Sequence, residues 1–297
     1  MRVHVHHILA ALDQLAPFSL AESWDNVGLL AGNPETRVTS ILLGLDPTIR
    51  LLDEAIDRGA NTIITHHPFI FHPLSTILTS TPVGIFLEKA LAHTINVISC
   101  HTNLDNAESG VSDALAKALG LTALTALRPL ATTEKGTTGL GRIGIFDPPL
   151  SGAAFMERLF QTLHLTTIPV AGRVPEQIKT VALCGGSGSE LAETARSRGA
   201  DLYLSAEIKH STARWAEECG FCVIDGSHYG TEQPVMPYLQ DMIQTMAATN
   251  NWSLEVFLTQ TEKHPFHSYS KTDVPSIHSK TDNTNGSQTC NHTNNPI

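Results

Sequence analysis

Short apolar runs alternate with longer amphipathic segments along the first 120 residues. The runs predict strands at residues 40–46, 61–65 and 95–100. The amphipathic segments predict helices at 48–59, 82–93 and 109–119, the first with Thr48 as N-cap and Gly59 as its stop. Nearly continuous apolar strands that alternate with helices indicate a parallel sheet covered on both faces.

The same alternation returns in the second half of the chain. It weakens at residues 122–139, which we interpret as a connection, and then predicts strands at 141–146, 181–184, 201–204, 221–224 and 254–258. Helices are expected at 151–164, 189–198, 206–219 and 231–246. We therefore predict an α/β fold of two similar lobes, residues 1–125 and 126–267, with mostly parallel sheets covered by helices.

The last 30 residues have a different composition. Half of residues 268–297 are Ser, Thr or Asn, and few are apolar. Such a segment buries too little surface to offset the entropy of ordering it. We predict a disordered polar tail.

Composition narrows the possible partners. Among the 297 residues, 41% are hydrophobic and the formal net charge is −10, which argues against nucleic acid or an anionic membrane as a partner. No apolar run reaches membrane-spanning length, and the first residues lack a convincing secretory signal, so we expect a cytoplasmic protein. The five scattered cysteines do not form a disulfide framework, and we interpret Cys219 and Cys222, a lone CxxC, as structural.

The fifteen histidines are the unusual feature, and several follow predicted strands. His66 and His67 end the second strand, and His101 and Asp105 follow the third. In the second lobe, Glu207, His228 and Glu232 follow strands in the same way. Because ligands gather beyond the carboxyl ends of strands in α/β sheets, we predict a metal site in the cleft between the lobes.

The spacing of these residues suits a pair of ions. Adjacent rings just past a strand end, with Pro68 after them, can splay toward two points a few ångströms apart. His228 and Glu232 can face the same way if a helical turn begins early. Imidazole and carboxylate together suit zinc, iron, manganese, cobalt or nickel. Taken alone, a His–His pair can also be incidental.

Other motifs have plainer interpretations. Residues 184–189, CGGSGS, can cradle a phosphate or form a tight strand–helix turn. The histidines at positions 4, 6 and 7 sit at the start of an expected amphipathic helix and are interpreted as surface residues. We expect Trp24 to pack, and Asp25 and Asn26 to approach the cleft.

Five ordered blocks resemble the Nif-three-like dinuclear metal-centre family, whose bacterial members are named GTP cyclohydrolase I type 2 homologues. They are residues 23–30 (SWDNVGLL), 65–69 (THHPF), 99–105 (SCHTNLD), 204–210 (LSAEIKH) and 226–232 (GSHYGTE), and Pro265-Phe266 also fits. The resemblance covers about residues 1–269. One departure is visible at residues 206–211, with Ala206 where Gly is common and Ser211 where a second His is often found.

The resemblance implies two divalent metal ions per subunit, with His66, His67, Asp105, His228 and Glu232 as their ligands. Glu232 is our choice for the carboxylate between the ions, and His101 for an additional ligand or a supporting residue. The resemblance also implies a ring-shaped homohexamer built as a trimer of dimers, here without the small inserted domain that some relatives carry.

The function that follows is a metal-dependent hydrolase resembling GTP cyclohydrolase I type 2. A metal-bridged hydroxide would attack a small-molecule substrate, with a nucleotide as the candidate. We assign catalytic roles to Glu232, His101 and Glu207, with His210 as another candidate for moving protons. Two alternatives stay open: a phosphoesterase unrelated to GTP, and a non-catalytic, metal-binding regulatory or partner-binding scaffold.

Overall fold

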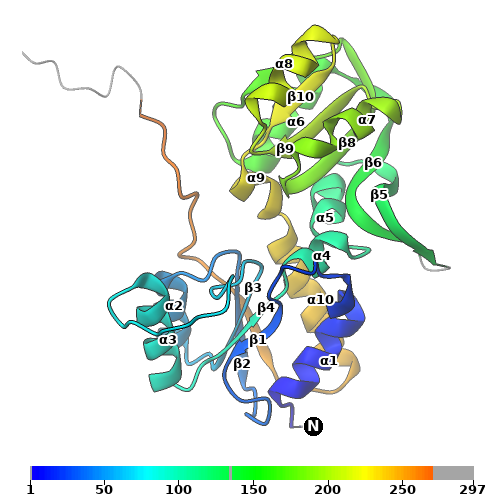
Figure 1. Cartoon of the computed structure of the whole chain (residues 1–297). Helices are drawn as coiled ribbons and strands as arrows, with labels where there is room; N and C mark the ends of the chain where they lie inside the picture. The colour runs from blue at the N-terminus through cyan, green and yellow to red at the C-terminus, as the bar shows by residue number, and fades with distance from the viewer. Residues whose placement is uncertain (1, 134–135, 270–297) are drawn as a thin grey trace, which may run out of the picture. The chain divides into compact units, whose positions relative to one another are not determined.

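The computed structural model describes residues 2–133 and 136–269. Up to His264 these residues form one compact unit, which contains two sheets covered by helices (Figure 1). This confirms the predicted α/β class. The boundary after residue 125 stays a prediction, and nearly all of the predicted tail, residues 270–297, lies outside the described residues.

The first sheet has the strand order β1-β4-β3-β2-β11 within the described residues. Strands β2, β3, β4 and β11 are parallel, and β1, which the sequence did not predict, joins the edge antiparallel to β4. The carboxyl ends of β2, β3 and β4 therefore meet at one edge of the sheet. The bounds are β1 (Gly28–Ala31), β2 (Ser40–Gly44), β3 (Thr62–Thr65), β4 (Asn96–Ser99) and β11 (Glu255–Leu258).

Strand β11 corrects the expected path of the chain. We expected residues 254–258 to belong to the second lobe, but Val256 pairs with Ile41 of β2 in the first sheet. The chain returns there through α10 (Val235–Thr249), whose buried Leu239 and Ile243 pack in the same core cluster as Ile41. The sheet that β11 joins is determined by tertiary packing, and the order of the strands along the sequence does not indicate it.

Helices cover both faces of the first sheet. α2 (Ile49–Arg58) and α3 (Pro82–Ala92) lie on one side, and α1 (Val5–Leu15) and α10 on the other (Figure 1). The predicted start of α2 is confirmed, because the Thr48 hydroxyl accepts a hydrogen bond from the Leu51 amide at 3.1 Å. Gly59 ends the helix in the left-handed conformation that glycine adopts without strain.

The second sheet is mixed, with the order β5-β6-β8-β9-β10-β7 within the described residues. Only β8, β9 and β10 run parallel, so this sheet is less parallel than expected. Residues 122–139 were expected to be a connection, but residues 122–133 and 136–139 lie in the antiparallel strands β5 and β6. The bounds are β5 (Thr122–Thr133), β6 (Gly136–Ser151), β7 (Val170–Ala171), β8 (Gln177–Ser187), β9 (Leu202–Ala206) and β10 (Cys222–Asp225).

Two helices pack on each face of the second sheet. α5 (Val111–Ala118) and α6 (Gly152–Leu163) contribute to one core cluster, and α7 (Ala192–Ser197) and α8 (His210–Glu218) to the other. The short elements are η1 (Phe18–Leu20), α4 (Thr102–Asn106), η2 (Ser189–Leu191) and α9 (His228–Glu232). In the described part of the chain, no helix has the length and apolar character needed to cross a bilayer. Cys219 and Cys222 are both free thiols, in keeping with a structural role.

Candidate metal centre

His66 and His67 follow β3 directly and are held through their Nδ1 atoms. The Nδ1 of His66 donates to the carbonyl oxygen of Cys100 at 2.8 Å, and the Nδ1 of His67 donates to Asp46 Oδ1 at 2.8 Å. The two ring centroids lie 4.9 Å apart, with the planes tilted by 50°. Each ring therefore offers its Nε2, and the two nitrogens occupy separate positions.

Glu232 and His228 come from α9, which follows β10 of the second sheet. The helical turn begins at His228, because the Ser227 hydroxyl caps it by accepting from the Gly230 amide at 3.0 Å. His228 Nε2 lies 3.0 Å from Glu232 Oε1, at the i, i+4 spacing. Glu232 also reaches both histidines after β3: Oε1 is 3.6 Å from His66 Nε2, and Oε2 is 3.1 Å from His67 Nε2.

Three buried atoms at this place make no hydrogen bond within the described structure: His66 Nε2, Asp105 Oδ1 and Glu232 Oε2, the last of which is in ion-pair contact with His67 Nε2 at 3.1 Å. Asp105, from α4, lies 3.7 Å from His66 Nε2. An unpaired buried polar atom costs about 1–3 kcal/mol, so three in one place require an explanation. A bound cation would satisfy all of them.

The donor set fits a metal ion. The ligand atoms of His67, His228 and Glu232 all lie within 4.8 Å of one another, and so do those of His66, His67 and His101. His67 belongs to both groups. Neutral imidazole nitrogen and carboxylate oxygen are the ligands of zinc and of the other divalent transition metals.

The charges in the cluster are strongly coupled. Burial opposes ionisation of Glu232, but His66, His228 and His67 hold its pKa well below the usual range. Burial raises the pKa of Asp105 to about 7. Burial would lower the pKa of His67, but its interactions with the carboxylates of Asp46 and Glu232 raise it to about 10. Without a cation, then, protons on the imidazoles balance the buried carboxylate; metal binding would displace them.

Two carboxylates orient histidines from outside the cluster. His228 Nδ1 lies 3.0 Å from Glu207 Oε1, and His101 Nδ1 lies 2.9 Å from Asp25 Oδ1. Burial of Asp25 is outweighed by hydrogen bonds from His101 and Thr102, which lower its pKa. Such partners fix the tautomer and direction of a ligating ring. Asp25 thus approaches the site as expected.

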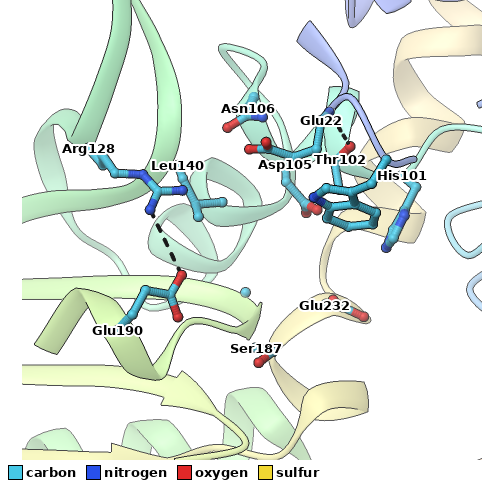
Figure 2. A pocket seen from close by; sticks show the side chains of 12 residues that line it. Glu22, His101, Thr102, Asp105, Asn106, Arg128, Leu140, Ser187, Glu190 and Glu232 are labelled. Atoms are coloured by element: carbon cyan, nitrogen blue, oxygen red, sulfur yellow. Dashed lines mark hydrogen bonds and ion pairs between the residues drawn. The ribbon is translucent and has the colours of Figure 1, made fainter. Parts of the chain in front are cut away.

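A cavity of about 440 Å³ opens beside the cluster. His101, Asp105 and Glu232 line it together with Trp24, and Arg128 and Glu190 line its other side (Figure 2). A cavity large enough for a small molecule therefore lies directly beside the candidate metal centre.

The family model described as Duf34/NIF3 (NGG1p interacting factor 3) matches residues 3–265. The chain belongs to the DUF34/NIF3 family. The resemblance inferred from the five sequence blocks is thereby confirmed.

Relatives of this NIF3 chain match it along most of its length. It is 34% identical to a Streptomyces coelicolor protein named "GTP cyclohydrolase 1 type 2 homolog", over 87% of this chain and 92% of that protein. A Clostridium acetobutylicum protein of the same name is 30% identical over 90% and 99% of the two chains. Among solved structures, a Staphylococcus aureus hypothetical protein superposes with a TM-score of 0.84 at 29% identity, covering 91% of this chain and all of that one.

Some residues of the NIF3 chain lie where the sequence did not place them. His210 is exposed and lines a different cavity, with Arg214, so it is apart from the cluster. Asn26 does not reach the cluster through its amide, which donates to the Ile70 carbonyl at 2.6 Å. Trp24, expected to pack, is 54% exposed and lines the cavity.

The glycine-rich segment after Cys184 packs closely against Thr231 and Glu232. The amides of Gly185 and Gly186 donate to the side chains of Ser112 and Thr231, at 3.2 and 3.0 Å. These two amides are engaged within the protein, which favours the tight-turn interpretation of the segment. Phosphate binding by residues 184–189 stays an untested alternative.

Sequence reasoning noted Asp46 at the end of the first strand but gave it no role, and it missed Glu262. Asp46 stands two residues after β2 and orients His67, a role that its position at a strand end could have suggested. Glu262 Oε1 accepts hydrogen bonds from the amides of Leu45 and Asp46, both at 2.8 Å. Nothing in the sequence pattern signals this contact, because more than 200 residues separate the partners.

Proposed function

We propose that this DUF34/NIF3 protein is a metal-dependent hydrolase whose centre holds two divalent ions. The observation that supports it most is the set of three buried atoms without a hydrogen bond on His66, Asp105 and Glu232. His66, Asp105 and Glu232 would hold one ion, and His67, His228 and Glu232 the other. Glu232 suits the position between the ions because its carboxylate contacts histidines of both sets, His66 in one and His67 and His228 in the other. The metal would be zinc, iron, manganese, cobalt or nickel.

When bound, the ions would supply a water nucleophile at neutral pH and polarise the substrate. Residues of the chain would provide proton transfer, positioning of the ligands and metal binding. Asp25 holds the Nδ1 proton of His101, which lines the cavity, so we assign His101 to proton transfer through Nε2. Glu207 is 60% exposed and bonded to His228, so we assign it a positioning role rather than a catalytic one. Glu232 acts as a ligand.

Metal content tests the centre. Elemental mass spectrometry of the purified protein is expected to give about two transition-metal ions per chain, with less in His67→Ala and in Glu232→Ala. His210→Ala is the matched control, because this exposed histidine lies outside the cluster, and its metal content should equal that of the wild type. Absence of metal after reconstitution would contradict the proposal.

Turnover tests the reaction. Nucleotides and phosphoesters would be screened with metal-loaded and metal-free protein; release of formate identifies a cyclohydrolase and release of phosphate a phosphoesterase. The names of the relatives favour a nucleotide substrate. We expect His101→Gln to lower kcat about 100-fold or more while metal content is retained. If no compound turns over faster with metal than without it, the hydrolase proposal fails and a partner-binding scaffold is the better account.

We also propose that the protein works in the cytoplasm as a homohexamer built from dimers, without nucleic acid. Exposed Ile77, Leu78 and Leu91 support assembly, because a second copy would bury this apolar surface. The net charge of −10 argues against nucleic acid. Size-exclusion chromatography with light scattering should give six times the mass of one chain, and a monomer would contradict the assembly.

A further inference from the structure

The cavity beside the metal cluster is lined by an aromatic ring and a guanidinium group that the proposed reaction does not use. Its volume of about 440 Å³ suits a small molecule. Trp24, from the segment before β1, and Arg128, from β5, both line it. In Figure 2, Arg128 and Glu190 lie on one side of the cavity, and His101 and Glu232 on the other.

Trp24 has the properties of a stacking surface. It is 54% exposed and lines the cavity. Its ring packs against Phe71 at 5.5 Å between centroids and meets His101 edge-on at 6.3 Å. These contacts hold the indole in place while more than half of its surface stays open. A rigid, supported aromatic ring next to a reactive centre is suited to bind another planar ring.

Arg128 is the cation among the described residues that line the cavity. The charged neighbours that it faces there are acidic, and the nearest, Glu190, is 4.0 Å away in a loose ion pair. About half of the Arg128 side chain remains exposed. A guanidinium that is not engaged in a close pair can bind the oxygens of a phosphate or carboxylate with two parallel hydrogen bonds.

We propose that the substrate carries a planar aromatic ring, which stacks on Trp24, and an anionic group, which Arg128 binds. The proposal rests on the proposed function, because it names the substrate class of the same site. The bound molecule would then lie beside His101 and Glu232, which line the same cavity. Nucleoside monophosphates combine a ring and a phosphate, so they serve as probes.

Isothermal titration of the full-length, metal-loaded protein tests this. We expect at least one of AMP, GMP, CMP and UMP to bind about 10-fold more tightly than ribose 5-phosphate, which lacks the ring. Trp24→Leu should weaken that nucleotide about 5-fold or more, while Trp24→Phe keeps most of the affinity. Arg128→Gln should weaken the nucleotide but leave its nucleoside unchanged. Arg196→Gln, which removes the same charge from exposed α7 outside the cavity, should change neither.

Two results would overturn the subsite. One is that no nucleotide binds better than ribose 5-phosphate; the other is that Trp24→Leu leaves the affinity unchanged. Metal content, measured on the same samples, separates this failure from failure of the proposed function. If metal is retained while ring binding is absent, only the subsite is refuted. If ring binding persists without any turnover, the subsite stands and the hydrolase does not.

Discussion

At the scale of single residues, Gly186 is the position where the backbone leaves room for Glu232, the proposed metal ligand. Its φ of +65° is strained for any residue with a side chain. A Cβ there would stand 2.2 Å from Glu232 Oε1 and 3.5 Å from His228 Cε1. The carboxylate therefore needs glycine at this position for steric as well as conformational reasons.

Gly186→Ala should weaken metal binding by about 10- to 100-fold, the range seen when the support of a ligand is disturbed. The new methyl group would displace the Glu232 side chain, and its carboxylate would move away from His66, His67 and His228. Competition with a coloured chelator measures the affinity. Gly199→Ala is the matched control, since Gly199 has a φ of +79° and nothing within 4 Å of a new Cβ. Equal metal affinity in the two variants would show that the contact with Glu232 has no role.

The site residues differ in how far sequence reveals them. Five chemically distinctive side chains at strand ends, His66, His67, Asp105, His228 and Glu232, could be chosen because their spacing suits metal ligands, and the structure brings them together. Of the residues that orient or support them, Asp25 was expected near the site, and Asp46 could have been suggested by its position after β2. Glu262 and Gly186 could not be chosen, because their roles depend on contacts between distant parts of the chain.

At the scale of elements, hydrogen bonds to Glu54 link helix α2 to the segment after β11. Its carboxylate accepts hydrogen bonds from the amides of Gln260 and Thr261 and from the hydroxyls of Thr259 and Thr261. Arg58, one turn later in α2, pairs with it at 3.0 Å. The terminal strand of the first sheet is therefore held at its end by a buried carboxylate.

Glu54→Gln should lower the free energy of unfolding at pH 7 by about 1–3 kcal/mol, because the amide accepts fewer and weaker hydrogen bonds. Burial alone would raise the pKa of Glu54, but the bonds from residues 259–261 and Arg58 lower it below the usual 4.5. A lowered pKa stabilises the fold above the unfolded value, and this stability disappears as pH falls through the folded value.

The difference between wild type and Glu54→Gln should thus shrink as pH drops below about 4.5. Urea unfolding in a series from pH 7 to pH 3 measures it. Glu255→Gln, on the exposed face of β11, removes the same charge and should have little effect at any pH. A constant difference between wild type and Glu54→Gln across the series would contradict the assigned role.

Elements with strong internal patterns could be predicted, and elements defined by their neighbours could not. The apolar runs of β2, β3 and β4 and the capped helix α2 appear where the alternation places them. Strand β5 was missed because its threonine-rich sequence is largely exposed and lacks a clear apolar face. Strand β11 was recognised as a strand but placed in the wrong sheet, since pairing depends on how α10 packs.

At the scale of the whole molecule, the candidate metal centre connects the two sheets. His66, His67 and Asp105 follow strands of the first sheet, whereas His228 and Glu232 follow β10 of the second. The buried pair of Arg142 and Asp113, 2.7 Å apart, makes a second connection, because Arg142 of β6 also donates to the Ala107 carbonyl after α4. The ions would thus stabilise the compact unit as a whole and not only a local loop.

Metal removal is therefore expected to lower the melting temperature of the entire unit. A ligand that binds only the folded state at about 100 times its dissociation constant adds about 2.7 kcal/mol of stability. For a chain of this size, that corresponds to a shift of about 5–10 °C. Differential scanning calorimetry before and after EDTA treatment, and again after zinc is restored, measures the shift. Glu232→Ala should melt at the same temperature in all three states, because it lacks the carboxylate that both ions would share. A metal-dependent shift in Glu232→Ala equal to that of the wild type would mean that the stabilising ions bind elsewhere.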